Sequence, residues 1–199
     1  MAKRFILILG GARSGKSDLA LKLAQDMGDP VLFVATAEAL DEEMRQRIQA
    51  HQRNRPPQWR TLEAPLRLAD ALEANAKDAA VVVIDCVTLW VANVLAATSP
   101  QGQDTPNVAA AEAMLAAELG GLHDWHRGSA ASLILVSNEV GQGLVPPYPS
   151  GRAYRDLLGG VNQRLATLAT EVYLVVAGIP IELKSLAIHP WRQDEPKEP

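Results

Sequence analysis

The sequence predicts an α/β fold in which helices cover both faces of a mainly parallel β-sheet. Two observations support this prediction. Short runs rich in Val, Ile and Leu alternate along the chain with longer segments of helical pattern, as in successive βαβ units. The short runs are also continuously apolar, which is typical of strands buried on both faces. Crossovers of the usual hand then put helices on both faces, and ligands bind at the carboxyl ends of the strands.

The expected elements alternate through nearly the whole chain. Strands are expected at the most aliphatic segments, which are residues 5–9, 31–35, 80–85, 132–137, 171–177 and 179–184. Helices are expected between them, at residues 16–27, 38–53, 65–76, 88–97, 108–126 and 153–170. Loops are expected where Pro, Gly and polar residues gather, at residues 54–58, 99–107 and 146–151.

The composition is that of an ordinary globular protein. With 199 residues, the chain can bury a core in one domain, which we expect to span residues 1–189. Residues 190–199 combine Pro and charge with little to bury, and are expected to form a disordered tail. The net charge of -4 and the scattered Lys and Arg residues argue against nucleic acid as a partner.

Cysteine content and hydropathy indicate a cytoplasmic protein. Cys86 is the single cysteine, so an intramolecular disulfide is excluded. The apolar run at residues 5–9 is too short for a secretory signal and ends in glycine instead of a cleavage site. No run reaches the roughly 18 apolar residues that a membrane-spanning helix needs. We therefore expect no membrane insertion.

A phosphate-binding loop follows the first expected strand. It fits the pattern G-x-x-x-x-G-K-[ST] and consists of Gly10, Gly11, Ala12, Arg13, Ser14, Gly15, Lys16 and Ser17. The glycines let the backbone wrap its N–H groups around phosphates, and the next helix adds its positive end. Lys16 brings a charge to the outer phosphates, and the Ser17 hydroxyl can bind Mg²⁺. The position between a strand and a helix makes a ligand-free glycine turn a poor alternative.

Asp85 is the expected acidic partner of this loop. It closes the run Val-Val-Val-Ile-Asp at residues 81–85, and a site for Mg²⁺ and nucleotide phosphates needs a carboxylate at the end of a buried strand. An Asp at this position could instead serve only as the N-cap of the following helix. The phosphate loop favours the metal role, so Ser17 and Asp85 are the predicted Mg²⁺ residues.

His51 lies in a basic segment at the end of an expected helix. Arg47, Arg53 and Arg55 surround it and could bind a phosphate chain, and a neutral imidazole nitrogen could attack phosphorus there. A histidine at such a place can equally be an ordinary surface residue. His123 and His126 stand three apart on an expected helix, and without further ligands nearby we interpret both as surface residues.

An ordered series of motifs carries a family resemblance. It begins with the phosphate loop and continues with Ala35-Thr36-Ala37, Asp41-Glu42-Glu43-Met44, Arg47-Ile48 before His51, Arg55-Pro56, Trp59-Arg60-Thr61, Glu63, Asn138-Glu139-Val140-Gly141, Gly143, Val145-Pro146 and Gly160-Val161-Asn162-Gln163-Arg164-Leu165-Ala166. Spread over residues 5–184, the series resembles the bifunctional adenosylcobinamide kinase/adenosylcobinamide-phosphate guanylyltransferase family of cobalamin synthesis. The resemblance implies a RecA-like P-loop NTPase fold.

The resemblance also implies two reactions. The γ-phosphate of GTP or ATP would pass to the aminopropanol hydroxyl of adenosylcobinamide, and GMP from GTP would then pass through a histidine to adenosylcobinamide phosphate. By motif position that histidine is His51, which with Lys16 would be catalytic. Besides the phosphate loop, the implied nucleotide contacts are Thr36, Ala37, Glu38, Gln52, Arg53, Asn54, Arg55, Glu63 and Asp85. The implied partners are Mg²⁺, a corrinoid and further copies of the chain, since the family often forms trimers.

Two rival functions remain open. A simple P-loop small-molecule kinase would phosphorylate its substrate without nucleotidyl transfer, and His51 would then be structural. A nucleotide-dependent switch would hydrolyse slowly with no small-molecule acceptor, but the sequence lacks the guanine-reading motif N-K-x-D. A P-loop reads phosphates and not bases, so the choice of ATP or GTP for the kinase step is not readable. The loops at residues 99–107 and 146–151 are candidates for corrinoid contacts by position and composition.

Overall fold

One seven-stranded sheet organises the computed structural model, which describes residues 2–37, 42, 55–100 and 105–188. Its strand order is β3-β2-β4-β5-β1-β6-β7. The strands are β1 (Phe5–Gly10), β2 (Val31–Ala35), β3 (Arg60–Glu63), β4 (Val81–Asp85), β5 (Ser132–Val136), β6 (Glu171–Val176) and β7 (Ile179–Glu182). All neighbouring pairs are parallel except β6 and β7, which form an antiparallel hairpin. The predicted mainly parallel sheet is therefore confirmed.

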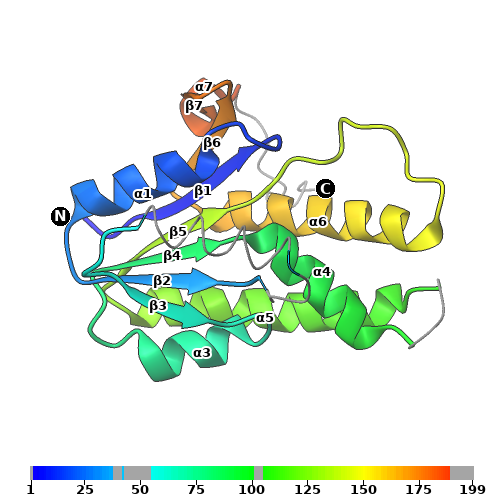
Figure 1. Cartoon of the computed structure of the whole chain (residues 1–199), viewed down its shortest axis with the longest axis horizontal. Coiled ribbons are helices and arrows are strands. Elements are labelled where there is room, and N and C mark those ends of the chain that lie inside the picture. The colour runs from blue at the N-terminus through cyan, green and yellow to red at the C-terminus, as the bar shows by residue number, and fades with distance from the viewer. Residues whose placement is uncertain (1, 38–41, 43–54, 101–104, 189–199) are drawn as a thin grey trace, which may run out of the picture.

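Helices cover both faces of this sheet, as the sequence predicts (Figure 1). They are α1 (Lys16–Met27), α3 (Leu68–Asn75), α4 (Val87–Thr98), α5 (Val108–Gly128), α6 (Pro149–Leu168) and the short α7 (Leu183–Leu186). Side chains alternate between the two faces of each strand. In β1, Ile6 and Ile8 join the core cluster of α1, whereas Phe5 and Leu7 join the larger cluster of α3 to α6. Both faces of the sheet are buried, which explains why the strand sequences are continuously apolar.

The main differences from the expectation concern β3, the start of α6 and the end of β7, which stops at Glu182 where the short helix α7 begins. Strand β3 has the sequence Arg-Thr-Leu-Glu and lies at the edge of the sheet with mostly exposed side chains, so no apolar run marks it. Helix α6 begins at Pro149, inside a segment expected to be a loop. Proline is well tolerated in the first turn of a helix, because its missing N–H would have no helical partner there. The expected helix at 38–53 and the expected tail at 190–199 lie outside the described residues, apart from Glu42.

The expectation that His126 is a surface residue is wrong. It lies in the last turn of α5 with 8% of its surface exposed, and its ring meets Phe5 edge-on with ring centroids 5.1 Å apart. Its Nε2 has no hydrogen-bond partner among the described residues. Burial lowers the pKa of His126 below its usual value, and the nearby charge of Lys3 lowers it further. A hydrogen bond with the Arg4 backbone acts in the opposite direction.

We expect His126 to make folding stability depend on pH. Because the pKa of its ring is lowered by folding, the unfolded chain binds a proton first as the pH falls. The stability is complete above the ordinary pKa of 6.5 and is lost below it, by at most about 1.4 kcal/mol per pH unit. Urea unfolding at about pH 7.5 and about pH 5.5 should show a smaller difference for His126→Leu than for the unmodified chain.

The matched control for this experiment is His123→Leu on the same helix. The His123 side chain is 36% exposed, and its charge is only the smallest of the causes that shift the pKa of His126, so its replacement should change the pH difference less than His126→Leu does. An equal pH difference in His126→Leu and in the unmodified chain would contradict a buried, neutral His126.

Candidate active site

The predicted site residues that the structure describes gather at the carboxyl edge of the sheet. Strand β1 runs into the phosphate loop at Gly10, and Asp85 is the last residue of β4. Glu63 ends β3, and Thr36 follows β2. Ala35 of β2 stands level with Glu63 on one side and with Asp85 on the other. The sheet register therefore brings together residues that are up to 75 positions apart in the sequence.

The Lys16 side chain folds back onto the backbone of the phosphate loop. The Lys16 ammonium donates a hydrogen bond of 2.6 Å to the Gly11 carbonyl oxygen. Arg13 and Gly15 have positive φ values of 55° and 98°, so the backbone curls before α1 begins. The Leu19 N–H then donates to the Gly15 carbonyl oxygen, which starts the helix. The loop thus has the strand–glycine turn–helix form that the sequence pattern predicts.

Lys16 is held in a nearly enclosed position. Only 8% of its surface is exposed, and burial lowers the pKa of its amino group. The negative charge of Asp85 acts in the opposite direction and favours the charged form of the lysine. A weakly solvated ammonium beside a carboxylate is well suited to bind the oxygens of a phosphate chain.

Ser17 and Asp85 meet as the sequence predicts. The Ser17 hydroxyl donates a hydrogen bond of 2.9 Å to Asp85 Oδ2, so the first turn of α1 is joined to the end of β4. A hydroxyl and a carboxylate are hard oxygen donors of the kind that Mg²⁺ prefers. In the described part of the chain no group of three or more His, Cys, Asp or Glu side chains is arranged to hold a metal. This pair would therefore have to act with oxygens from substrate and water.

Thr36, which follows the neighbouring strand β2, holds Cys86, the residue after Asp85. Its buried hydroxyl accepts a hydrogen bond from the Cys86 N–H at 2.9 Å and donates one to the Cys86 carbonyl at 2.7 Å. Asn93 of α4 holds the Thr36 carbonyl in turn. Burial, together with the Asp85 charge, raises the pKa of the Cys86 thiol to about 11, so it stays protonated at neutral pH. A protonated thiol is a weak nucleophile.

Arg55 is the described member of the predicted basic segment. Its guanidinium carbon lies 3.5 Å from the centre of the Phe33 ring, and its Nη1 donates to the Thr61 hydroxyl at 3.4 Å. Burial lowers the pKa of Arg55, while Asp85 acts in the opposite direction. Ala37 is partly buried after β2, and Glu63 is exposed at the end of β3. Five predicted site residues lie outside the described residues: Glu38, His51, Gln52, Arg53 and Asn54.

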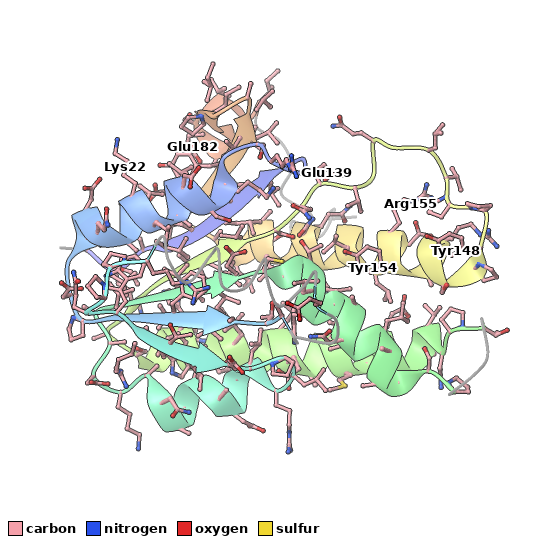
Figure 2. All side chains as sticks on the ribbon, viewed as in Figure 1. Lys22, Glu139, Tyr148, Tyr154, Arg155 and Glu182 are labelled. Carbon is pink, nitrogen blue, oxygen red and sulfur yellow. The ribbon has the colours of Figure 1, made fainter. Side chains whose placement is uncertain are left out.

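Asn138 and Glu139 belong to this edge, although the sequence reasoning gave them no role. They follow β5, which lies between β4 and β1 in the sheet. The Glu139 N–H donates to the Gly10 carbonyl at 3.1 Å, and the Glu139 carboxylate accepts from the Gly141 N–H at 2.6 Å (Figure 2). Two polar residues that follow a buried apolar strand could have indicated this position from the sequence, because ligands bind at the carboxyl ends of parallel strands.

Buried polar side chains hold this segment in place. The Asn138 N–H donates to the Thr88 hydroxyl at 2.9 Å, and its carbonyl accepts from Asn162 at 3.0 Å. Asn162 in turn accepts from the Ser137 hydroxyl at 2.7 Å. Because each of these buried groups has a partner, helices α4 and α6 are both tied to the end of β5.

A cavity of about 350 Å³ lies beyond this edge, between α4 and α6. Tyr148 and Tyr154 contribute to its wall (Figure 2). The remaining lining residues are Ala92, Leu95, Ala96, Ser99, Pro106, Ser150 and Gly151. The lining is mainly apolar, and it draws on both segments expected to be loops, at 99–107 and 146–151. Its size is within the usual range for small-molecule pockets.

No helix in the part of the chain that the structure describes is both long and apolar enough to cross a membrane. Among solved structures, a RadB recombinase overlaps this chain with a TM-score of 0.48 and 17% identity, covering 86% of this chain and 73% of its own. That likeness is too distant to support any inference.

Sequence comparison gives a much closer match. The family model described as cobinamide kinase / cobinamide phosphate guanyltransferase matches residues 6–183. The bifunctional adenosylcobalamin biosynthesis protein CobP of Pseudomonas aeruginosa is 44% identical over 178 residues, which is 89% of this chain and 96% of the relative. The protein CobU of Escherichia coli, with the same description, is 41% identical over 180 residues, which is 90% of this chain and 99% of the relative. The phosphate loop, the Ser17–Asp85 contact and these matches agree, and the chain belongs to the cobinamide kinase/cobinamide phosphate guanylyltransferase family.

Proposed function

We propose that the chain catalyses both reactions of its family, with GTP as the guanylyl donor and adenosylcobinamide as the acceptor. It phosphorylates the aminopropanol hydroxyl of adenosylcobinamide with GTP or ATP. It then transfers GMP from GTP to adenosylcobinamide phosphate and releases pyrophosphate. Membership in the family supports both reactions. The observation that carries the proposal is the contact between Ser17, in the phosphate loop, and Asp85.

In the kinase step, the phosphate loop binds the nucleotide through its backbone N–H groups and through Lys16. The acceptor hydroxyl attacks the γ-phosphorus, the bond from that phosphorus to the bridging oxygen breaks, and the hydroxyl proton is released. Ser17 and Asp85 would hold Mg²⁺, which when bound neutralises charge on the β- and γ-phosphates. Lys16 contributes a second positive charge, and the enclosed position of its ammonium strengthens that interaction.

In the guanylyl step, His51 is the proposed nucleophile. A neutral ring nitrogen attacks the α-phosphorus of GTP, a P–N bond forms, and the bond to the leaving pyrophosphate breaks. A phosphate oxygen of adenosylcobinamide phosphate then attacks the same phosphorus, and the P–N bond breaks to restore the histidine. Two steps spare the site from holding GTP and the bulky corrinoid in one attack geometry. Support for an Arg55 contact to phosphates comes from its partly buried guanidinium and its interaction with Asp85.

The cavity between α4 and α6 is the proposed place for an apolar part of the corrinoid. Support comes from its mainly apolar lining and from Tyr148 and Tyr154, which add large surfaces at little entropic cost. It also draws on both loops that the sequence suggests for corrinoid contacts. A homo-oligomer, often a trimer in this family, remains a proposal from the resemblance, and a cytoplasmic location remains a proposal from cysteine content and hydropathy.

We expect replacements of His51 and Lys16 to separate the two reactions. His51→Ala should abolish guanylylation and spare the kinase, because only the guanylyl step uses the imidazole. Lys16→Ala should abolish both, because both need the nucleotide phosphates held. Incubation with Mg²⁺ and GTP labelled at the α-phosphate, followed by denaturing electrophoresis, should give a labelled band that is lost in acid and kept in alkali.

The same labelling experiment discriminates the rival functions. A labelled band that persists in His51→Ala would overturn the proposed nucleophile. No band in a protein that still phosphorylates the corrinoid would leave a simple kinase. Hydrolysis of nucleotide with no phosphorylated corrinoid would favour a nucleotide-dependent switch.

We expect Asp85→Asn to raise the Mg²⁺ concentration needed for half-maximal kinase activity by about 10- to 100-fold, because the substitution removes one negative charge beside Ser17. The measurement is kinase activity against Mg²⁺ concentration at fixed GTP. Asp78→Asn is the matched control, since Asp78 is an exposed carboxylate paired with Arg60. Equal Mg²⁺ requirements in the two variants would count against a metal role for Asp85.

A further inference from the structure

The turn between β6 and β7 contacts the phosphate loop. Ala177 and Gly178 are the two residues of this turn, since Val176 pairs with Ile179 on either side of it. Their φ values of 51° and 81° are both positive, as in the type I′ turns of hairpins with two-residue loops. The Gly178 N–H donates a hydrogen bond of 2.8 Å to the Ser14 carbonyl oxygen, in the middle of the loop.

This hydrogen bond orients a second group through the peptide plane. The Ser14 carbonyl and the Gly15 N–H belong to one peptide unit, which is planar and trans here. In a trans peptide the C=O and N–H bonds point in opposite directions. A carbonyl held by the β6–β7 turn therefore directs the Gly15 N–H away from the turn. The N–H groups of such a loop are the groups that wrap nucleotide phosphates.

Close packing fixes the loop against the same hairpin at both glycines of the pattern. A Cβ atom on Gly15 would lie 3.3 Å from the Gly178 Cα, which is tighter than ordinary packing. A Cβ atom on Gly10 would lie 2.4 Å from the Val175 carbonyl oxygen, which is a clash. Val175 stands level with Gly10 in the sheet and is buried. The loop thus rests on β6 and its turn at Gly10, Ser14 and Gly15.

We propose that the β6–β7 turn is a positioning element of the nucleotide site, in which the Gly178 N–H orients the Gly15 N–H toward the bound phosphates. The inference rests on the proposed binding of nucleotide by residues 10–17. Gly178 acts only through the Ser14–Gly15 peptide, and glycine suits it because φ is positive there. The hairpin lies at the end of the sheet opposite to β3, far along the chain from every motif assigned to the nucleotide.

Three single variants test this role. Gly178→Val should weaken GTP binding about tenfold, the loss of roughly one hydrogen bond to a charged group, because a β-branched residue is strained at positive φ and would displace the turn. Gly178→Asn should stay within about twofold, since Asn tolerates positive φ and keeps the N–H. The space around a Cβ at this position is open, so neither variant fails by collision.

Gly28→Val is the matched control. Gly28 also has a positive φ, of 99°, and also has open space around a Cβ, but it ends α1. The length of that helix separates it from the loop by about 18 Å. We expect it to lose stability to urea like Gly178→Val while its GTP dissociation constant stays unchanged. The comparison separates general destabilisation from loss of loop geometry.

Hydrogen exchange in the unmodified protein gives a test that needs no substitution. GTP should slow hydrogen exchange of the Gly178 amide. Bound phosphates would fix the phosphate loop, and the fixed Ser14 carbonyl would stabilise its hydrogen bond with the Gly178 N–H. Unchanged affinity in Gly178→Val, equal losses of affinity in Gly178→Val and Gly28→Val, or unchanged Gly178 exchange would each overturn the positioning role. Absence of GTP binding by the unmodified protein would instead overturn the proposed function together with this inference.

Discussion

The hydrogen bond between Ser17 and Asp85 is the constraint on which the site depends. It joins the first turn of α1 to the end of β4, two strands away from β1 in the sheet order. Such a contact is possible because all parallel strands end at one edge, where backbone and side-chain polar groups are no longer used by the sheet. Lys16 is one residue earlier; burial lowers the pKa of its amino group, and the charge of Asp85 partly offsets that effect.

The intervening strand explains why this edge is well ordered. Strand β5 lies between β4 and β1. Without further contacts, the residues that follow it could adopt several conformations. Asn162 and Thr88 prevent this by satisfying the polar groups of Asn138 from α6 and α4. Glu139 then bonds to Gly10, which ties the segment to the phosphate loop. Fully paired polar groups of this kind favour one arrangement, since any other would leave buried donors without acceptors.

Local structure that depends on neighbouring residues was predicted well. The phosphate loop, Asp85 and most strand and helix positions follow from glycine spacing, aliphatic runs and element length, which act over a few residues. Strand β3 was missed because an edge strand with exposed side chains has no apolar signature. The sequence predicts a surface position for His126 because the burial of its ring depends on Phe5, which lies 121 positions earlier in the chain. His51 and its neighbours remain predictions from the sequence.

The sequence by itself determined that this chain has a phosphate loop, alternating strands and helices, and the motif series of its family. Each single motif and each element depends on residues that are close together along the chain, so their spacing alone predicts the local geometry. Only the tertiary structure decided which distant groups share the site. The support of Thr36 for Cys86, the hydrogen bond of the Glu139 N–H to Gly10 and the contact of Gly178 with Ser14 all depend on strand order and register. Strand order and register arise from packing over the whole sheet, which no local pattern specifies.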